Sequence, residues 1–138
     1  EARRMTRLVI PLVSRPGVQA DAAFVFHSWL KGSRAAYPQM RSDDYYALQH
    51  QRIERLLAAG TLVVLHPVDA PAVIGAWALL DSAGGVFHYV HTKGEYRGQG
   101  HATRLLEGRL ITTHMTEAGA KLKRKLGLRY LPHLLDSA

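Results

Sequence analysis

Two glycines at the start of an expected helix constrain the fold of this chain more than any other feature. Gly98 and Gly100 follow a run of aromatic and β-branched residues, 86–93, and lie at the start of a segment, 99–108, whose leucines have helical spacing. Glycine permits backbone dihedrals that other residues avoid, and it lets a ligand approach the main chain closely. The first amides of a helix also lack intrahelical partners and carry partial positive charge. The turn is therefore either a plain connection or a site for an anionic group.

This turn does not match the two best-known phosphate-binding motifs. A P-loop ends in Gly-Lys-Ser/Thr, and no such ending follows Gly100. A dinucleotide-binding fingerprint needs a third glycine and an early β-α-β unit, and the sequence shows neither. Glycine spacing by itself thus leaves the role of the turn open.

The hydrophobic pattern predicts an order of elements that gives a mixed sheet. Asp21 and Ser42 are the expected N-caps of the first two helices, and Gly60 is expected to end the second, whose apolar stripe includes Leu48. Three consecutive strands followed by a β-α-β unit predict an α/β (α+β) fold with a mixed, mostly antiparallel central sheet flanked by helices. The expected strands are 6–14, 61–66, 72–81, 86–93 and 110–115, the helices are 21–30, 42–59, 99–108 and 117–126, and a closing segment spans 128–135.

The composition is that of a globular protein. The 138 residues fit one domain, 1–138, and no apolar run approaches the roughly 20 residues of a membrane helix, so no membrane partner is expected. Cysteine is absent, which rules out thiol nucleophiles and suits a reducing, cytoplasmic location. A formal charge of +7 favours an anionic partner. A nucleic acid is disfavoured, because the basic residues are not interleaved with aromatic ones.

The turn and its surroundings resemble a known family. The run Arg97-Gly98-Gln99-Gly100-His101-Ala102 matches the pattern Arg/Gln-x-x-Gly-x-Gly/Ala, the acetyl-CoA motif of the GNAT N-acetyltransferase superfamily, and the element order is similar nearly end to end. The resemblance implies acetyl-CoA as co-substrate. It also implies that backbone groups bind the cofactor, His101 included. The pyrophosphate would be held by Arg97, Gly98, Gln99, Gly100, His101, Ala102 and Thr103, and the pantetheine by Val90, His91 and Thr92.

The same resemblance implies the direct transfer of an acetyl group to a primary amine within a ternary complex. The acceptor would be a small-molecule or peptide amine, and a base must remove its proton. His88 and His91 are the catalytic candidates, since imidazole titrates near neutral pH, although each could equally be an interior side chain. Strand alternation places His88, Val90 and Thr92 on one face and Phe87, Tyr89 and His91 on the other.

Lys123 occupies the position at which the resemblance places a proton-donating tyrosine, about four residues before Gly127. Lys123 could protonate the leaving thiolate, or it could belong to a solvated basic helix face. Because this position departs from the family pattern, a non-catalytic GNAT-fold module that binds CoA or a protein partner is the alternative function.

The acceptor side is expected in the loop 31–41, with Ser33 and Tyr37 as substrate-binding residues. Arg34 and Arg41 in that loop hint at an acidic or phosphate-bearing acceptor, or serve solubility alone. No metal is expected, because the histidines lack the short spacing of ligands. A homodimer is one expectation, since the family's last strand could come from a partner chain.

Overall fold

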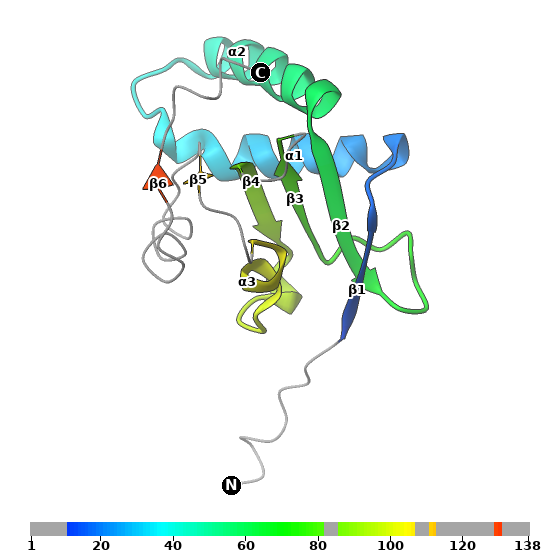
Figure 1. Ribbon diagram of the computed structural model, residues 1–138. Helices are drawn as coiled ribbons and strands as arrows, with labels where there is room; N and C mark the ends of the chain where they lie inside the picture. Colours follow the sequence, from blue (N-terminus) through cyan, green and yellow to red (C-terminus); the bar gives the residue numbers. More distant parts are fainter. Residues whose placement is uncertain (1–10, 82–85, 107–110, 113–128, 131–138) are drawn as a thin grey trace, which may run out of the picture.

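A six-stranded mixed sheet organises the computed structural model, which describes residues 11–81, 86–106, 111–112 and 129–130 (Figure 1). The strands lie in chain order; β1 to β4 are antiparallel neighbours, whereas β4–β5 and β5–β6 are parallel. The predicted fold class is therefore confirmed. The elements are β1 (Leu12–Pro16), η2 (Gln19–Asp21), α1 (Ala22–Ser33), η3 (Arg34–Ala36), α2 (Ser42–Ala59), β2 (Thr61–Pro67), β3 (Ala76–Leu80), β4 (Val86–Thr92), η4 (Gly94–Tyr96), α3 (His101–Leu106), β5 (Ile111–Thr112) and β6 (Arg129–Tyr130).

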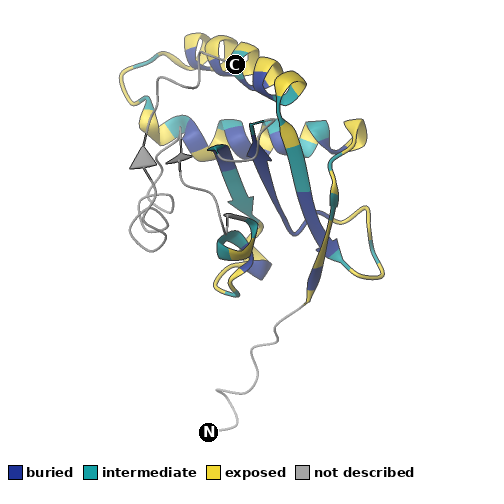
Figure 2. Ribbon diagram, viewed as in Figure 1, coloured by how far each residue is buried: buried dark blue, intermediate teal, exposed yellow. Residues whose placement is uncertain are grey.

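The helices lie on both faces of this sheet. Trp77 and Leu79 of β3 pack in the main core with side chains of α1 and α2, whereas Ala78 and Leu80 pack with Leu105 of α3. Since side chains alternate along a strand, α1 and α2 cover one face and α3 covers the other. Figure 2 shows the consequence: β3 is buried throughout, and the outer side of α2 is exposed. Among the described helices, none is both long and apolar enough to cross a membrane.

The predicted helix boundaries agree with the structure better than the predicted N-cap bonds do. The helix from Ser42 to Gly60 forms as predicted, but its N-cap is Arg41, with no side-chain cap bond, so the cap prediction for Ser42 is wrong. Asp21 is the N-cap residue of α1, as predicted, but its side chain makes no cap bond, since the carboxylate accepts the Val18 N–H at 2.7 Å. The predicted helix 117–126 lies outside the described residues, and of the strand 110–115 only β5 is described.

The buried face of α2 differs from the predicted stripe. Leu48 is 39% exposed, while the helix buries Tyr45, Gln49, Ile53 and Leu56. These four positions recur at intervals of three and four residues, which is the spacing of one helix face. A polar residue, Gln49, therefore takes the place that an apolar pattern had assigned to leucine.

A β-bulge in β4 overturns the simple alternation expected for that strand. Leu79 pairs with Tyr89 while Leu80 pairs with Phe87, so His88 has no Cα partner in β3. Phe87 and Val90 consequently both pack in the cluster on the α3 face, and the prediction that Phe87 shares a face with Tyr89 is wrong. An extra residue shifts every side chain before it to the opposite face.

Tyr89 joins this bulge to α1. Its ring stacks on Trp29 at 5.1 Å and on Trp77 at 5.4 Å between centroids, and its side chain is 5% exposed. A Cβ added at Gly32 would overlap the Tyr89 hydroxyl, so glycine is needed at that point of α1. This contact sets the distance between the last turns of α1 and strand β4.

We expect Gly32→Ala to destabilise the fold by about 1–3 kcal/mol, the usual cost of overpacking, although alanine favours a helix. Adding Tyr89→Phe should recover part of that loss, because the hydroxyl is the group that the new methyl meets. Gly94→Ala is the control, since no described atom beyond its chain neighbours lies within 4 Å of its added Cβ. Chemical denaturation measures all variants, and an unchanged Gly32→Ala protein would contradict the contact.

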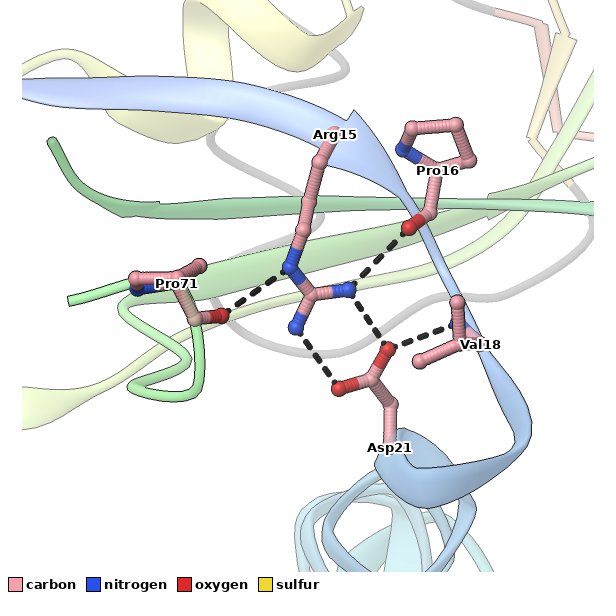
Figure 3. Close-up of polar contacts among 5 residues, drawn as sticks. All are labelled: Arg15, Pro16, Val18, Asp21 and Pro71. Carbon is pink, nitrogen blue, oxygen red and sulfur yellow. Dashed lines mark hydrogen bonds and ion pairs between the residues drawn. The ribbon is translucent and has the colours of Figure 1, made fainter.

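Arg15 ties three segments together at the end of β1 (Figure 3). Its guanidinium makes two hydrogen bonds of 2.8 Å to the Asp21 carboxylate and donates to the Pro16 and Pro71 carbonyls at 3.0 Å. A bidentate pair of this kind fixes orientation as well as distance. The β2–β3 connection and the entry into α1 are thereby held against β1.

The hydrogen bond and charge of Arg15 lower the pKa of Asp21 below its ordinary value, outweighing its burial. A lowered folded-state pKa adds stability that is present above the unfolded pKa and is lost as pH falls through the folded one. Asp21→Asn should therefore cost about 1.5–3 kcal/mol at neutral pH. The difference from wild type should shrink below about pH 4. Denaturation at a series of pH values measures it, and a pH-independent difference would contradict this role.

Candidate functional site

The turn between β4 and α3 has the backbone that its glycines predict. Gly98 has φ of 75° and Gly100 has φ of 84°, and no other residue has a positive φ in the described chain. Side-chain-bearing residues avoid this region, so both positions require glycine. Apart from its chain neighbours, no atom of the described residues lies within 4 Å of the place where a Cβ would stand on Gly100. The main chain is thus open on that side, as the approach of a ligand to its amides would require.

Polar contacts hold this turn to the end of β4. The Arg97 side chain donates through Nε to the Thr92 carbonyl at 2.9 Å, and Gln99 donates to the Glu95 carbonyl at 3.3 Å. Arg97, which directly precedes Gly98, is exposed. A cation next to a glycine turn that begins a helix favours an anion.

α3 begins directly after Gly100, whose carbonyl accepts the Arg104 N–H at 3.0 Å. His101 is 5% exposed, and its ring meets Tyr96 edge-on at 6.4 Å between centroids. Ala102 and Thr103 are half-buried. His101 therefore anchors the first turn of the helix by packing, which leaves the backbone as its route to a ligand.

The described pairings of β4 differ between its two sides. Val86 and Phe87 pair with Ile111 and Thr112 of β5, whereas the ladder with β3 continues to Thr92. Among the described residues, 88–92 has no partner strand on the β5 side. This edge includes Val90, His91 and Thr92, and it leads directly into the glycine turn. An extended ligand can hydrogen-bond to such an edge as a strand would.

The two candidate histidines differ in their surroundings. His91 is half-buried, with Phe24 at 5.8 Å and Trp77 at 6.3 Å between ring centroids. Burial and the charge of Arg97 lower the pKa of His91 to about 4. His88 is 3% exposed in the bulge, and burial lowers its pKa while the Asp81 carboxylate opposes that shift. Neutral imidazole is the favoured form of both at pH 7.

Ser33 and Tyr37, both predicted to bind substrate, have different environments. Ser33 is fully buried, with its hydroxyl 2.8 Å from the Trp29 carbonyl and 2.7 Å from the Tyr45 hydroxyl, so the prediction that it contacts an acceptor is wrong. Tyr37 is half-buried, and its hydroxyl accepts a hydrogen bond from Arg52 at 3.0 Å. Lys123 lies outside the described residues.

The sequence reading missed Gln49 and Arg52, which complete a network between α1 and α2. Gln49 donates to the Ser33 hydroxyl at 3.2 Å and accepts from Arg52 at 2.9 Å. Tyr45, Gln49 and Arg52 are four and three residues apart, which places them near one face of α2. This spacing was the sequence signal from which the network could have been predicted. No cluster of three or more potential metal ligands occurs within the part of the chain that the structure describes.

The sequence matches no protein-family model and no curated protein. The structure is similar to the crystal structure of a predicted acetyltransferase with acetyl-CoA from Clostridium acetobutylicum, with a TM-score of 0.55 and 14% sequence identity. The match covers 88% of this chain and 92% of that one. The fold is GNAT-like.

His91 should remain neutral under conditions in which an ordinary histidine is charged. Because its folded-state pKa of about 4 lies below the ordinary 6.5, the unfolded chain binds more protons between these values. His91 thus makes stability fall as pH drops from 6.5 toward 4. NMR titration of the imidazole signals, with His91→Gln to assign the resonance, should give a midpoint well below 6.5. A midpoint near 6.5 would contradict the burial argument.

Proposed function

We infer that this chain is an acetyl-CoA-dependent N-acetyltransferase that moves an acetyl group to a primary amine by direct transfer. The observation that carries this proposal is the turn between β4 and α3, in which Gly98 and Gly100 have positive φ and no described atom beyond the chain neighbours lies within 4 Å of a Cβ placed on Gly100. The GNAT-like fold supports it, since a protein of similar fold was crystallised with acetyl-CoA.

Acetyl-CoA would fit this chain through its backbone. The pyrophosphate would lie on the amides of the turn, from Arg97 to Thr103, with the Arg97 charge beside it. The pantetheine would run along the edge of β4 at Val90, His91 and Thr92, where no other described strand pairs on the β5 side. The space around Gly100 supports this placement, because any side chain there would occupy it. When bound, acetyl-CoA supplies an activated thioester.

The transfer needs a neutral amine, stabilisation of the developing oxyanion and a proton for the departing thiolate. The amine nitrogen attacks the thioester carbonyl, the C–S bond breaks, and the amine proton passes to a base. A backbone N–H of β4 can stabilise the negative oxygen.

His88 is the stronger candidate for the base. The Asp81 carboxylate raises the pKa of His88 against the effect of burial, whereas both burial and the Arg97 charge lower the pKa of His91. A base with a pKa of about 4 retains a proton poorly at neutral pH, so His91 is better suited to binding through its backbone. Lys123 is proposed as the donor to the thiolate, from its position in the sequence alone.

A non-catalytic CoA-binding module is the second candidate function. Lys123 in place of the tyrosine expected from the family favours it, because the proton donor would then be altered. Binding of acetyl-CoA without the release of CoA in the presence of any amine would favour the module over the enzyme.

Acetyl-CoA should bind the wild-type chain in a calorimetric titration, and Gly100→Glu should weaken binding by about 100-fold or more, since a carboxylate facing a phosphate costs several kcal/mol. Gly94→Glu is the matched control. It adds the same charge six residues earlier, at a glycine that is also open, and should change affinity by less than about tenfold. Gly100→Ala separates the strain of a positive φ from the effect of charge.

Thiol release from acetyl-CoA with a panel of primary amines then distinguishes the enzyme from the module. Release with at least one amine would establish transfer. Equal affinity of wild type and Gly100→Glu, or no binding of acetyl-CoA to the folded chain, would contradict the proposal at the turn itself.

A further inference from the structure

The segment between α1 and α2 holds a tyrosine hydroxyl in a fixed orientation. Arg34 donates to the Tyr37 and Met40 carbonyls, both at 2.7 Å, and its guanidinium lies 4.8 Å from the centre of the Tyr45 ring. The Tyr37 N–H donates in turn to the Arg34 carbonyl at 3.1 Å. The Arg34 side chain therefore holds its own loop in place. The sequence suggested that Arg34 binds an anionic acceptor or serves solubility, whereas in the structure its guanidinium binds two carbonyls of that loop.

The Tyr37 side chain is oriented as firmly as its backbone. Its ring packs against Tyr45 at 5.6 Å between centroids, and its hydroxyl oxygen accepts a hydrogen bond from Arg52 Nη1 at 3.0 Å. The same Arg52 nitrogen donates to Gln49, which is 1% exposed and hydrogen-bonded to Ser33. A buried chain of polar groups thus sets the position of Arg52, and Arg52 sets the position of the phenol.

The Tyr37 phenol still has its own proton to donate. A phenol both donates and accepts, and Arg52 can only donate, so the bond between them occupies the oxygen and leaves the O–H. Within the described part of the chain, no group accepts a hydrogen bond from Tyr37 Oη. The side chain is half-buried, so this donor is partly accessible to solvent. An oriented donor next to a guanidinium complements a negatively charged oxygen.

The pair lies at the end of α1 that covers the bulge of β4. Gly32 touches the Tyr89 hydroxyl, and Ser33, the next residue, is bonded to Tyr45, on whose ring Tyr37 packs. Figure 1 shows the same relation, with the turn from α1 into α2 on the side of the sheet where β4 and β5 lie. A molecule held by Tyr37 would therefore be on the α1 face, near the strand at which transfer is proposed.

We propose that Tyr37, oriented by Arg52, binds a carboxylate carried by the acceptor, so that the acceptor is an amine that also bears a carboxylate, such as an amino acid. The inference rests on the proposed function and names its substrate class. A polyamine is disfavoured, because its second cationic group would meet the Arg52 charge at this position.

Matched pairs of amines test the proposal. L-Phenylalanine is compared with 2-phenylethylamine, and γ-aminobutyrate with propylamine, so each pair differs by one carboxylate. In the thiol-release assay, the carboxylated member should have the higher kcat/KM by about tenfold or more, since a charge-assisted hydrogen bond discriminates at least that strongly. Equal or reversed preference in both pairs would overturn the proposal.

Tyr37→Phe removes the hydroxyl and keeps the ring that packs on Tyr45. It should raise KM for the carboxylated amines by about tenfold, leave kcat nearly unchanged, and alter the decarboxylated partners by less than about twofold. Tyr46→Phe is the control, because Tyr46 also contacts Tyr45 but is 48% exposed. A loss for Tyr37→Phe that is equal for both members of each pair would indicate a purely structural role and overturn the proposal.

Calorimetric titration of the same amines into the chain saturated with CoA gives a readout that does not depend on turnover. Tighter binding of the carboxylated amines, weakened by Tyr37→Phe, would support this subsite even if no acetyl transfer occurred. Failure of acetyl-CoA to bind would count against the proposed function and not against the subsite. Failure of both carboxylated amines to bind more tightly than their partners would overturn the subsite with acetyl-CoA binding intact.

Discussion

The aromatic stack between α1 and β4 is the contact on which the geometry of the candidate site depends. Tyr89 contacts both Trp29 and Trp77, which also contact each other at 5.7 Å between centroids, and the Trp77 indole donates to the buried Ser28 hydroxyl at 2.9 Å. Because Gly32 leaves room for the phenol, α1 can lie directly on the bulged strand. Interiors packed at this density transmit displacements instead of absorbing them. The α1 end and the β4 edge are therefore positioned together.

The turn itself was predictable because its determinants are local. Gly98 and Gly100 adopt a backbone that only glycine tolerates well, and strand and helix signals flank them in sequence. The antiparallel pairing of β2, β3 and β4 was predictable for a similar reason, since short connections favour antiparallel neighbours. Both conclusions need only the identity and spacing of residues within about ten positions of one another.

The acceptor side was not predictable to the same depth, because its contacts join residues that are distant in sequence. Ser33 looked like an exposed loop residue, yet α1 extends through it and Tyr45 and Gln49 close over it. The bulge at His88 depends on how β3 pairs with β4, and no single strand pattern reveals it. Glutamine on an apolar helix face was a usable sign, since a buried amide requires partners.

The two sides of the proposed site therefore differ in how they obtain specificity. The acetyl-CoA side would rely on main-chain groups and glycine, which many sequences can supply without other similarity; this fits a shared fold at 14% identity. The proposed acceptor side would rely on side chains, Tyr37 and Arg52, whose placement depends on the buried network of Gln49 and Ser33. In this proposal the selection of an acceptor would come from that network, because backbone amides recognise a phosphate but cannot distinguish one amine from another.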